Sequence, residues 1–169
     1  MLFRSPNAHV PPFATHYVGA GGVVLRDDGR LLVVSERYKL LPGRRLKLPG
    51  GALQGSEHIS DAVVREVKEE TGINARFEAV VCLRHWHGYR HGKSDIYFVC
   101  RLTPLSFDIA HDPDEIAECL WMPKDEFLAD PDVHAFNKRI VRAALESKGL
   151  SREFLEGYGT PETHELLFP

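Results

Sequence analysis

Hydrophobic and polar positions alternate with two different periods along the chain, and each period predicts its own kind of element. Between Ile59 and Thr71 apolar residues recur every four positions with charged residues opposite them, and Gly72 follows as a stop signal, so a helix is predicted there. Short helices are also expected over residues 124–128 and 133–148. Apolar runs bounded by turn residues predict strands over 17–26, 30–36, 75–86, 95–102 and 119–122.

The order of these elements is strands, helix, strands and helices, which predicts an α/β fold with a mixed sheet and helices on its faces. Asp27-Asp28-Gly29 predicts a hairpin between the first two strands. Residues 41–55 are rich in glycine and hold two prolines, so a loop is expected.

A chain of 169 residues suits one domain, which we place at residues 16–149. Residues 1–15 are expected to form an extended lead-in, and the alternative is an arm that contacts a second subunit of a homodimer through Phe3 and Phe13. The pattern does not define the structure of residues 150–169.

Composition narrows the function classes. The chain is 43% hydrophobic and 27% charged, which is typical of a globular domain, and its net charge of −3 argues against a nucleic-acid-coating surface. Its three cysteines have no metal-ligand spacing and lie in strand-like runs, so buried free thiols in a reducing compartment are expected. No apolar run is long enough for a membrane span or a signal core, and we therefore expect a cytoplasmic protein.

The predicted helix carries a cluster of carboxylates. At about 100° per residue, Glu66 and Glu70 point within about 40° of each other, and Glu69 lies about 60° to the other side of Glu66. Arg65 can neutralise Glu69, whereas Glu66 and Glu70 have no cationic partner on this helix. A hard divalent cation such as Mg²⁺ would balance them, and the alternative is an ordinary solvated face.

The loop before this helix favours the metal interpretation. Gly50 and Gly51 allow the main chain to approach a cation or a phosphate closely. Glu57 has no obvious catalytic geometry, and we expect it to bond Arg65 or loop amides and so fix the loop against the helix.

Residues 51–73 match every fixed position of the Nudix box, and the chain resembles the Nudix hydrolase family on that motif. The resemblance implies an α/β/α sandwich with the box as a loop–helix–loop, and Mg²⁺ or Mn²⁺ as cofactor. Carried over residue by residue, it implies metal ligands at Glu66, Glu70, Glu69 and the Gly50 carbonyl, and an orienting pair at Arg65 and Glu57.

Other segments resemble the plant ADP-ribose/NADH pyrophosphatases and the vertebrate Nudix protein encoded antisense to basic fibroblast growth factor. They are Lys47–Gly50, Lys93–Asp95, Phe98–Cys100, Leu105–Ile109 and Trp121–Pro123. This resemblance implies cleavage of ADP-ribose or NADH to AMP and a phosphorylated remainder. It also matches Glu115 to an acidic loop residue, so Glu115 is the first candidate for the general base or a further metal ligand, and Glu69 is the second. The alternative for Glu115 is an exposed loop acid.

Aromatic and basic residues at the end of the fourth strand-like run are candidates for binding the substrate together with Gly51. Arg84, His85 and Trp86 could clamp a phosphate or stack on a base, and the alternative for Trp86 is half-core packing. The histidines have no spacing that predicts zinc, and Trp121 is expected in the core.

The motif does not define which group is attached to the nucleoside diphosphate and leaves in the reaction. Nucleoside triphosphates, sugar nucleotides and capped RNA are alternative substrates, and a non-catalytic module that senses a nucleotide is an alternative of another class.

Overall fold

The computed structural model describes residues 15–38 and 45–169, and it contains the predicted strands and helices in the predicted order. The chain runs β1 (His16–Val24), β2 (Arg30–Glu36), β3 (Gly50–Ala52), α1 (Ile59–Thr71), β4 (Ala75–Trp86), η1 (Arg90–Gly92), β5 (Ser94–Pro104), β6 (Ile116–Pro123), α2 (Lys124–Ala129), α3 (Ala135–Glu146), β7 (Ser151–Glu153) and β8 (Leu166–Phe168). Strands β3, β7 and β8 were not predicted, because each has only three residues and no room for a period. Phe3 and Phe13 lie outside the described residues.

The main sheet has the order β3-β1-β5-β4 and is mixed, as predicted, because β1 and β5 run parallel and the other pairs run antiparallel. The predicted hairpin between β1 and β2 is wrong. Its turn forms, with Gly29 at φ 81°, but the strands share only the bridge between Leu25 and Leu31. Since β3 and β5 occupy both edges of β1, β2 pairs instead with β6 in a second sheet.

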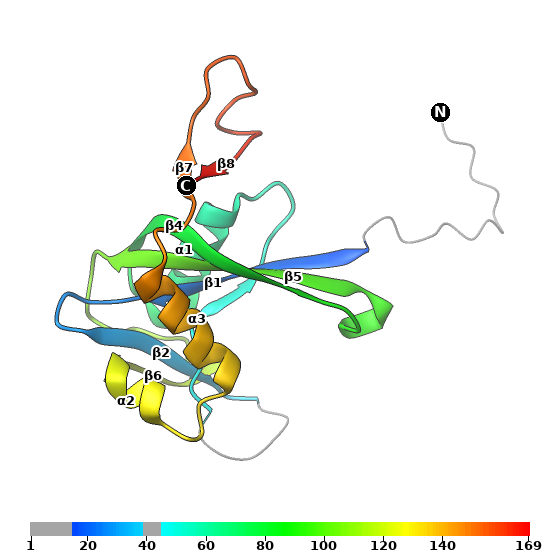
Figure 1. Ribbon diagram of the computed structural model, residues 1–169. Coiled ribbons are helices and arrows are strands. Elements are labelled where there is room, and N and C mark those ends of the chain that lie inside the picture. The colour runs from blue at the N-terminus through cyan, green and yellow to red at the C-terminus, as the bar shows by residue number, and fades with distance from the viewer. Residues whose placement is uncertain (1–14, 39–44) are drawn as a thin grey trace.

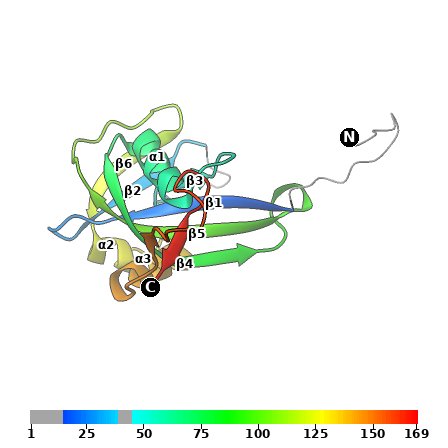
Figure 2. The same ribbon diagram turned by 90° about the horizontal axis from the view of Figure 1, so that it is seen from above.

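Two hydrophobic layers lie on opposite faces of the strands, and neighbouring residues of one strand alternate between them. Val23 packs with residues of α2 and α3, whereas Val24 packs with Val63 and Val67 of α1. Figure 2 shows this sandwich edge-on, with α1 on one side of the strands and α2 and α3 on the other. The arrangement confirms the expected α/β/α architecture.

Helix α1 is held at both ends. At its C-terminus Gly72 is left-handed, with φ 75°, and its N–H donates to the Lys68 carbonyl at 2.8 Å, which confirms it as the predicted stop. At its N-terminus the preceding His58 provides no side-chain cap. The Glu165 carboxylate caps the helix instead, by accepting from the N–H groups of Ile59 (2.7 Å) and Ser60 (3.1 Å).

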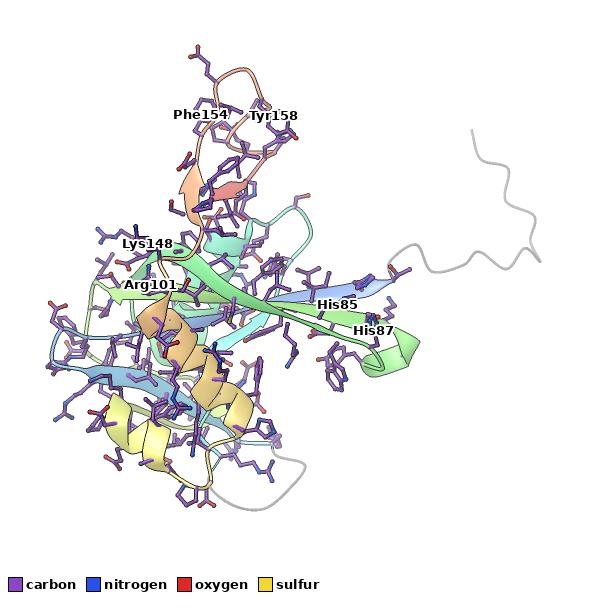
Figure 3. The ribbon with its side chains drawn as sticks, in the orientation of Figure 1. His85, His87, Arg101, Lys148, Phe154 and Tyr158 are labelled. Atoms are coloured by element: carbon purple, nitrogen blue, oxygen red, sulfur yellow. The ribbon has the colours of Figure 1, made fainter. Side chains whose placement is uncertain are left out.

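Glu165 belongs to the C-terminal segment, whose two strands β7 and β8 form a small antiparallel pair. The segment projects beyond the main sheet (Figure 1), with Phe154 and Tyr158 toward its far end (Figure 3). Leu167 packs against the α1-side core. The tail that the sequence pattern did not define is therefore attached to the helix that carries the box.

Arg101 fixes the end of α3 against β5. Its guanidinium donates to the carbonyl of Ala144 (3.0 Å) in the last turn of α3 and to those of Ser147 (2.7 Å) and Lys148 (2.7 Å), which directly follow the helix (Figure 3). The three cysteines are free thiols, as predicted, but Cys100 is buried whereas Cys82 and Cys119 are half-buried. Burial raises the pKa of Cys119 to about 12. No helix in residues 15–38 and 45–169 is both long and apolar enough to cross a membrane.

Candidate active site

Glu70 is the most enclosed acid of the box. Its side chain is 11% exposed, its Oε2 accepts from the Gly50 N–H at 2.8 Å, and its Oε1 lies 3.7 Å from Lys47 Nζ. Burial raises the pKa of Glu70, an effect that Lys47 and the Gly50 N–H partly oppose. Lys47 and the Gly50 N–H balance the charge of the buried Glu70 carboxylate only in part. A further cation next to it would therefore stabilise its charged form.

Gly50 and Gly51 must be glycines, because a side chain at either position would collide with neighbouring atoms. A Cβ on Gly51 would lie 2.4 Å from Glu66 Oε2, and a Cβ on Gly50, whose φ is 151°, would lie 2.4 Å from the Ala20 carbonyl. The main chain of β3 thus runs beside Glu66 and Glu70. The expected approach of this main chain to a cation or a phosphate stays a prediction.

Arg65 joins the acids of the box to one another. Its Nε and Nη2 donate to both oxygens of Glu57 at 2.7 and 2.9 Å, and its Nη1 donates to Glu66 at 2.8 Å and to Glu69 at 2.9 Å. The predicted Arg65–Glu69 pair is confirmed. The expectation that Glu66 lacks a cationic partner on this helix is wrong, because the guanidinium fork reaches both carboxylates at once.

Glu57 has the structural part that the sequence suggested. Besides the bidentate pair with Arg65, its Oε2 accepts from the Gln54 N–H at 2.9 Å. The Arg65 hydrogen bonds lower the pKa of Glu57, with the Gln54 N–H acting in the same direction. Arg65 also donates to the Ala52 carbonyl at 3.2 Å, so the loop, β3 and α1 share one anchor.

A cleft of about 290 Å³ opens beside this cluster. Gly50 and Gly51 form one side, and Lys47, Arg84 and Tyr97 line it further along. A second cavity of about 200 Å³ shares Lys47, Arg84 and Tyr97, and it extends toward α3. The cleft therefore combines main-chain donors and two cations next to the acids of α1.

Aromatic rings cluster at the outer end of the cleft. The Tyr89 ring lies edge-on to those of Tyr17 and Trp86, with centroids 5.5 and 5.3 Å apart. The Arg84 guanidinium lies 5.5 Å from the Trp86 ring and is paired with Asp95 at 2.5 Å. Trp86 is 46% exposed and packs against Tyr89 and Arg84, so its ring is partly covered, as half-core packing implies, while the rest stays open to solvent.

His85 is placed apart from the cleft. Successive side chains of a strand point to opposite faces, so His85 faces away from Arg84 and Trp86. Its Nε2 lies 3.1 Å from that of His16, and its ring lies 4.3 Å from that of His87 (Figure 3). The structure thus puts three of the four predicted substrate-binding residues, Gly51, Arg84 and Trp86, on the cleft side, and it separates His85 from them.

Glu115 lies in the loop before β6 with its side chain exposed. Its carbonyl accepts from the Arg37 N–H at 2.8 Å, and the next residue, Ile116, pairs with Glu36 at the end of β2. Within the described part of the chain, no hydrogen bond or ion pair joins its carboxylate to the acids of α1. Its assignment as general base stays a prediction. Trp121 is half-buried and donates from its indole N–H to the Phe107 carbonyl at 3.0 Å, so it lies at the border of the core rather than inside it.

The sequence did not single out Lys47, Glu36, Tyr17 and Tyr97 as site residues. Lys47 lies between two carboxylates, at 2.5 Å from Glu36 and 3.7 Å from Glu70. Its position three residues before Gly50 was a usable signal. The Tyr97 hydroxyl lies where a side chain on Gly21 or Gly50 would be, and burial raises its pKa. Only the pairing of β1, β3 and β5 reveals that approach.

The donor set suits a hard cation, since it consists of carboxylates and a main-chain carbonyl. The acids do not already converge on one point, because Arg65 occupies Glu66 and Glu69. Among the residues described, no three His, Cys, Asp or Glu side chains are grouped as metal ligands. Glu70, Glu66 and the Gly50 carbonyl are the groups that would hold a divalent ion, with Glu69 available if it turns from Arg65.

Comparison with known proteins agrees with this geometry. Residues 15–144 match the NUDIX domain family. The chain is 45% identical over 135 residues to Nudix hydrolase 8 of Arabidopsis thaliana, covering 78% of this chain and 37% of that protein. It is 38% identical to nucleoside diphosphate-linked moiety X motif 6 of Xenopus laevis, covering 80% of this chain and 63% of that protein. The chain thus spans from about a third to under two thirds of the length of these relatives.

Solved structures share the fold. A NUDIX hydrolase from Nitrosomonas europaea superposes with a TM-score of 0.68 at 25% identity, over 83% of this chain and 98% of that one. A UDP-X diphosphatase superposes with a TM-score of 0.61 at 19% identity, over 83% of this chain and 65% of that one. The complete box, the sandwich around it and these matches agree, and the chain belongs to the Nudix family.

Proposed function

We propose that the protein hydrolyses the diphosphate linkage of a small nucleoside diphosphate derivative, with ADP-ribose or NADH as the favoured substrates and Mg²⁺ or Mn²⁺ as the cofactor. The products are AMP and the phosphorylated remainder. The observation that carries the proposal is the enclosed Glu70, bonded to the Gly50 N–H and adjacent to Glu66, at the mouth of a cleft lined by cations.

Each part of the cleft has a task in this proposal. Lys47 and Arg84 would orient the diphosphate, because both line the cleft and carry donors that match phosphate oxygens. Tyr17, Trp86 and Tyr89 present ring faces and edges suited to stacking on an adenine or nicotinamide ring. These aromatic side chains are the reason for preferring a dinucleotide-like substrate to inorganic pyrophosphate.

Glu70, Glu66 and the Gly50 carbonyl would hold the divalent ion, with Glu69 completing or bridging the set. The bound ion would lower the pKa of a coordinated water and neutralise charge on the diphosphate oxygens. Arg65 and Glu57 would keep the acids oriented. Glu115, and Glu69 after it, are the candidates for accepting the proton of the attacking water. Glu69 is 58% exposed, so solvent can reach it.

A substrate panel with Mg²⁺ tests this function. ADP-ribose, NADH, NAD, sugar nucleotides, deoxynucleoside triphosphates and capped RNA are compared by kcat/KM, with AMP release followed by chromatography. We expect ADP-ribose or NADH to rank first and Glu70→Gln to abolish turnover of every substrate. A clear preference for deoxynucleoside triphosphates would refute the substrate proposal. Tight binding of ADP-ribose without turnover would favour a nucleotide-sensing module.

A further inference from the structure

Helix α1 borders a second groove, on its side opposite Glu66 and Glu70. A groove of about 660 Å³ lies between α1, the start of β4 and the C-terminal strand β7. Its size is in the range of small-molecule sites. At about 100° per residue, Lys68 in this groove points about 160° away from both Glu66 and Glu70.

Positive charge gathers in the groove from three separate elements. Lys68 comes from α1, Arg76 from β4 and Arg152 from β7. Arg65 of α1 also lines the groove, but its guanidinium is bonded to Glu57, Glu66 and Glu69. In the described part of the chain the Lys68 ammonium has no ion pair. Arg76 is 66% exposed, with Glu78 at 3.8 Å, and Arg152 lies 3.7 Å from Asp61, the one carboxylate that lines the groove. The cations are therefore under-compensated, which favours an anionic ligand.

Apolar side chains form the floor beside these cations. Val64 and Phe77 are half-buried and Leu105 is 62% exposed, and all three line the groove. An apolar floor with a few convergent charged groups is the usual composition of a site for a ligand that has a planar apolar part and an anionic part. Inorganic phosphate alone would leave this floor uncovered.

We propose that this groove is a second ligand site, which binds a nucleoside monophosphate of the class of AMP. The phosphate lies among Lys68, Arg76 and Arg152, and the base lies on Phe77 and Leu105. The C-terminal segment completes the site, because Arg152 is held toward the groove by Ser60 Oγ at 3.3 Å and by the Pro161 carbonyl at 3.3 Å. The cleft and this groove lie on different flanks of α1, and Arg65 stands at the border between the groove and the box. Binding of AMP in the groove does not depend on the proposed hydrolase activity.

The test is an NMR titration of the ¹⁵N-labelled protein with AMP, in EDTA so that no turnover occurs. We expect amide shifts at Val64, Phe77 and Arg152 that saturate together. Ribose 5-phosphate and adenosine, which each carry one half of AMP, should bind more weakly than AMP at the same amides. If ribose 5-phosphate binds as tightly as AMP, or if AMP shifts only the cleft residues, the proposal is wrong.

Charge variants assign the site. Lys68→Gln combined with Arg76→Gln removes two cations that do not anchor the tail, and it should weaken AMP binding at these amides by roughly tenfold or more. Arg142→Gln removes an exposed cation of α3 and is the matched control, with binding expected to be unchanged. Equal affinity of the double variant and the wild type would overturn the proposal. Hydrolase activity of the double variant is measured separately, so failure of the proposed function and failure of this site remain distinct results.

Discussion

Replacing Arg65 with alanine should loosen the whole box, because one guanidinium holds three carboxylates and a carbonyl. It makes two bonds to Glu57, one to Glu66, one to Glu69 and one to the Ala52 carbonyl. The side chain of Arg65 is 22% exposed, and those of Glu57 and Glu66 are 15% and 16% exposed. Removing the cation leaves two largely enclosed carboxylates unpaired.

The expected loss of stability follows from this burial. Breaking a fully buried pair costs about 3–5 kcal/mol, and breaking an exposed one costs about 0–1 kcal/mol. Partly enclosed Glu57 and Glu66 place Arg65→Ala between these limits, at about 2–3 kcal/mol. For a domain of this size that corresponds to a melting temperature lower by roughly 4–12 °C. Activity should fall as well, since Glu66 and Glu69 lose the group that orients them.

Calorimetry and steady-state kinetics of the wild type and three variants measure both effects. Arg65→Lys keeps the charge but loses the fork, so we expect its melting temperature to lie between those of Arg65→Ala and the wild type. Arg142→Ala, on the exposed face of α3, is the control for loss of an exposed arginine. An Arg65→Ala variant that melts with the wild type and keeps its kcat would refute the assignment of Arg65 as the anchor of the box.

Two further changes test the enclosed acid and the aromatic cluster. Because burial raises the pKa of Glu70 above its usual 4.5, the free energy of unfolding should fall as pH rises from that value through the folded-state pKa. Glu70→Gln removes this cost, so the variant should be more stable at neutral pH by about 0.5–2 kcal/mol in urea unfolding while losing turnover. A less stable variant would contradict the inferred cost of burying the Glu70 charge. Tyr89→Ala removes a stacking surface worth about 1–3 kcal/mol per base, so KM for ADP-ribose should rise roughly 5- to 100-fold with little change in kcat. The exposed Tyr158→Ala should leave KM unchanged, and an equal KM for Tyr89→Ala would remove the stacking role.

Local patterns in the sequence predicted what depends on neighbours along the chain. The period of Ile59, Val63 and Val67 with Gly72 behind it defined α1, and the spacing of Arg65 and Glu69 predicted their pair. Contacts between distant strands could not be predicted in this way. Strand β1 is paired on both edges, so β2 pairs with β6 instead. This choice depends on competition between strands that are far apart in the sequence.

The same limit explains the site residues that were missed or misplaced. Lys47 approaches Glu70 of α1 from the other side of the loop. Tyr97 on β5 approaches Gly50 on β3 across β1. His85 was grouped with Arg84 and Trp86 by adjacency, although alternation along a strand puts neighbours on opposite faces. The helix cap supplied by Glu165 joins residues more than a hundred positions apart, and no local pattern encodes it.

Binding of Mn²⁺ to the substrate-free protein tests whether the acids of α1 hold a divalent ion. Electron paramagnetic resonance counts free Mn²⁺ during titration of the wild type, of Glu70→Gln and of Glu153→Gln, an exposed acid of the tail. We expect signal loss in the wild type and in Glu153→Gln, with little or none in Glu70→Gln. Equal binding by all three proteins would contradict the assignment of the divalent-ion site to the acids of α1.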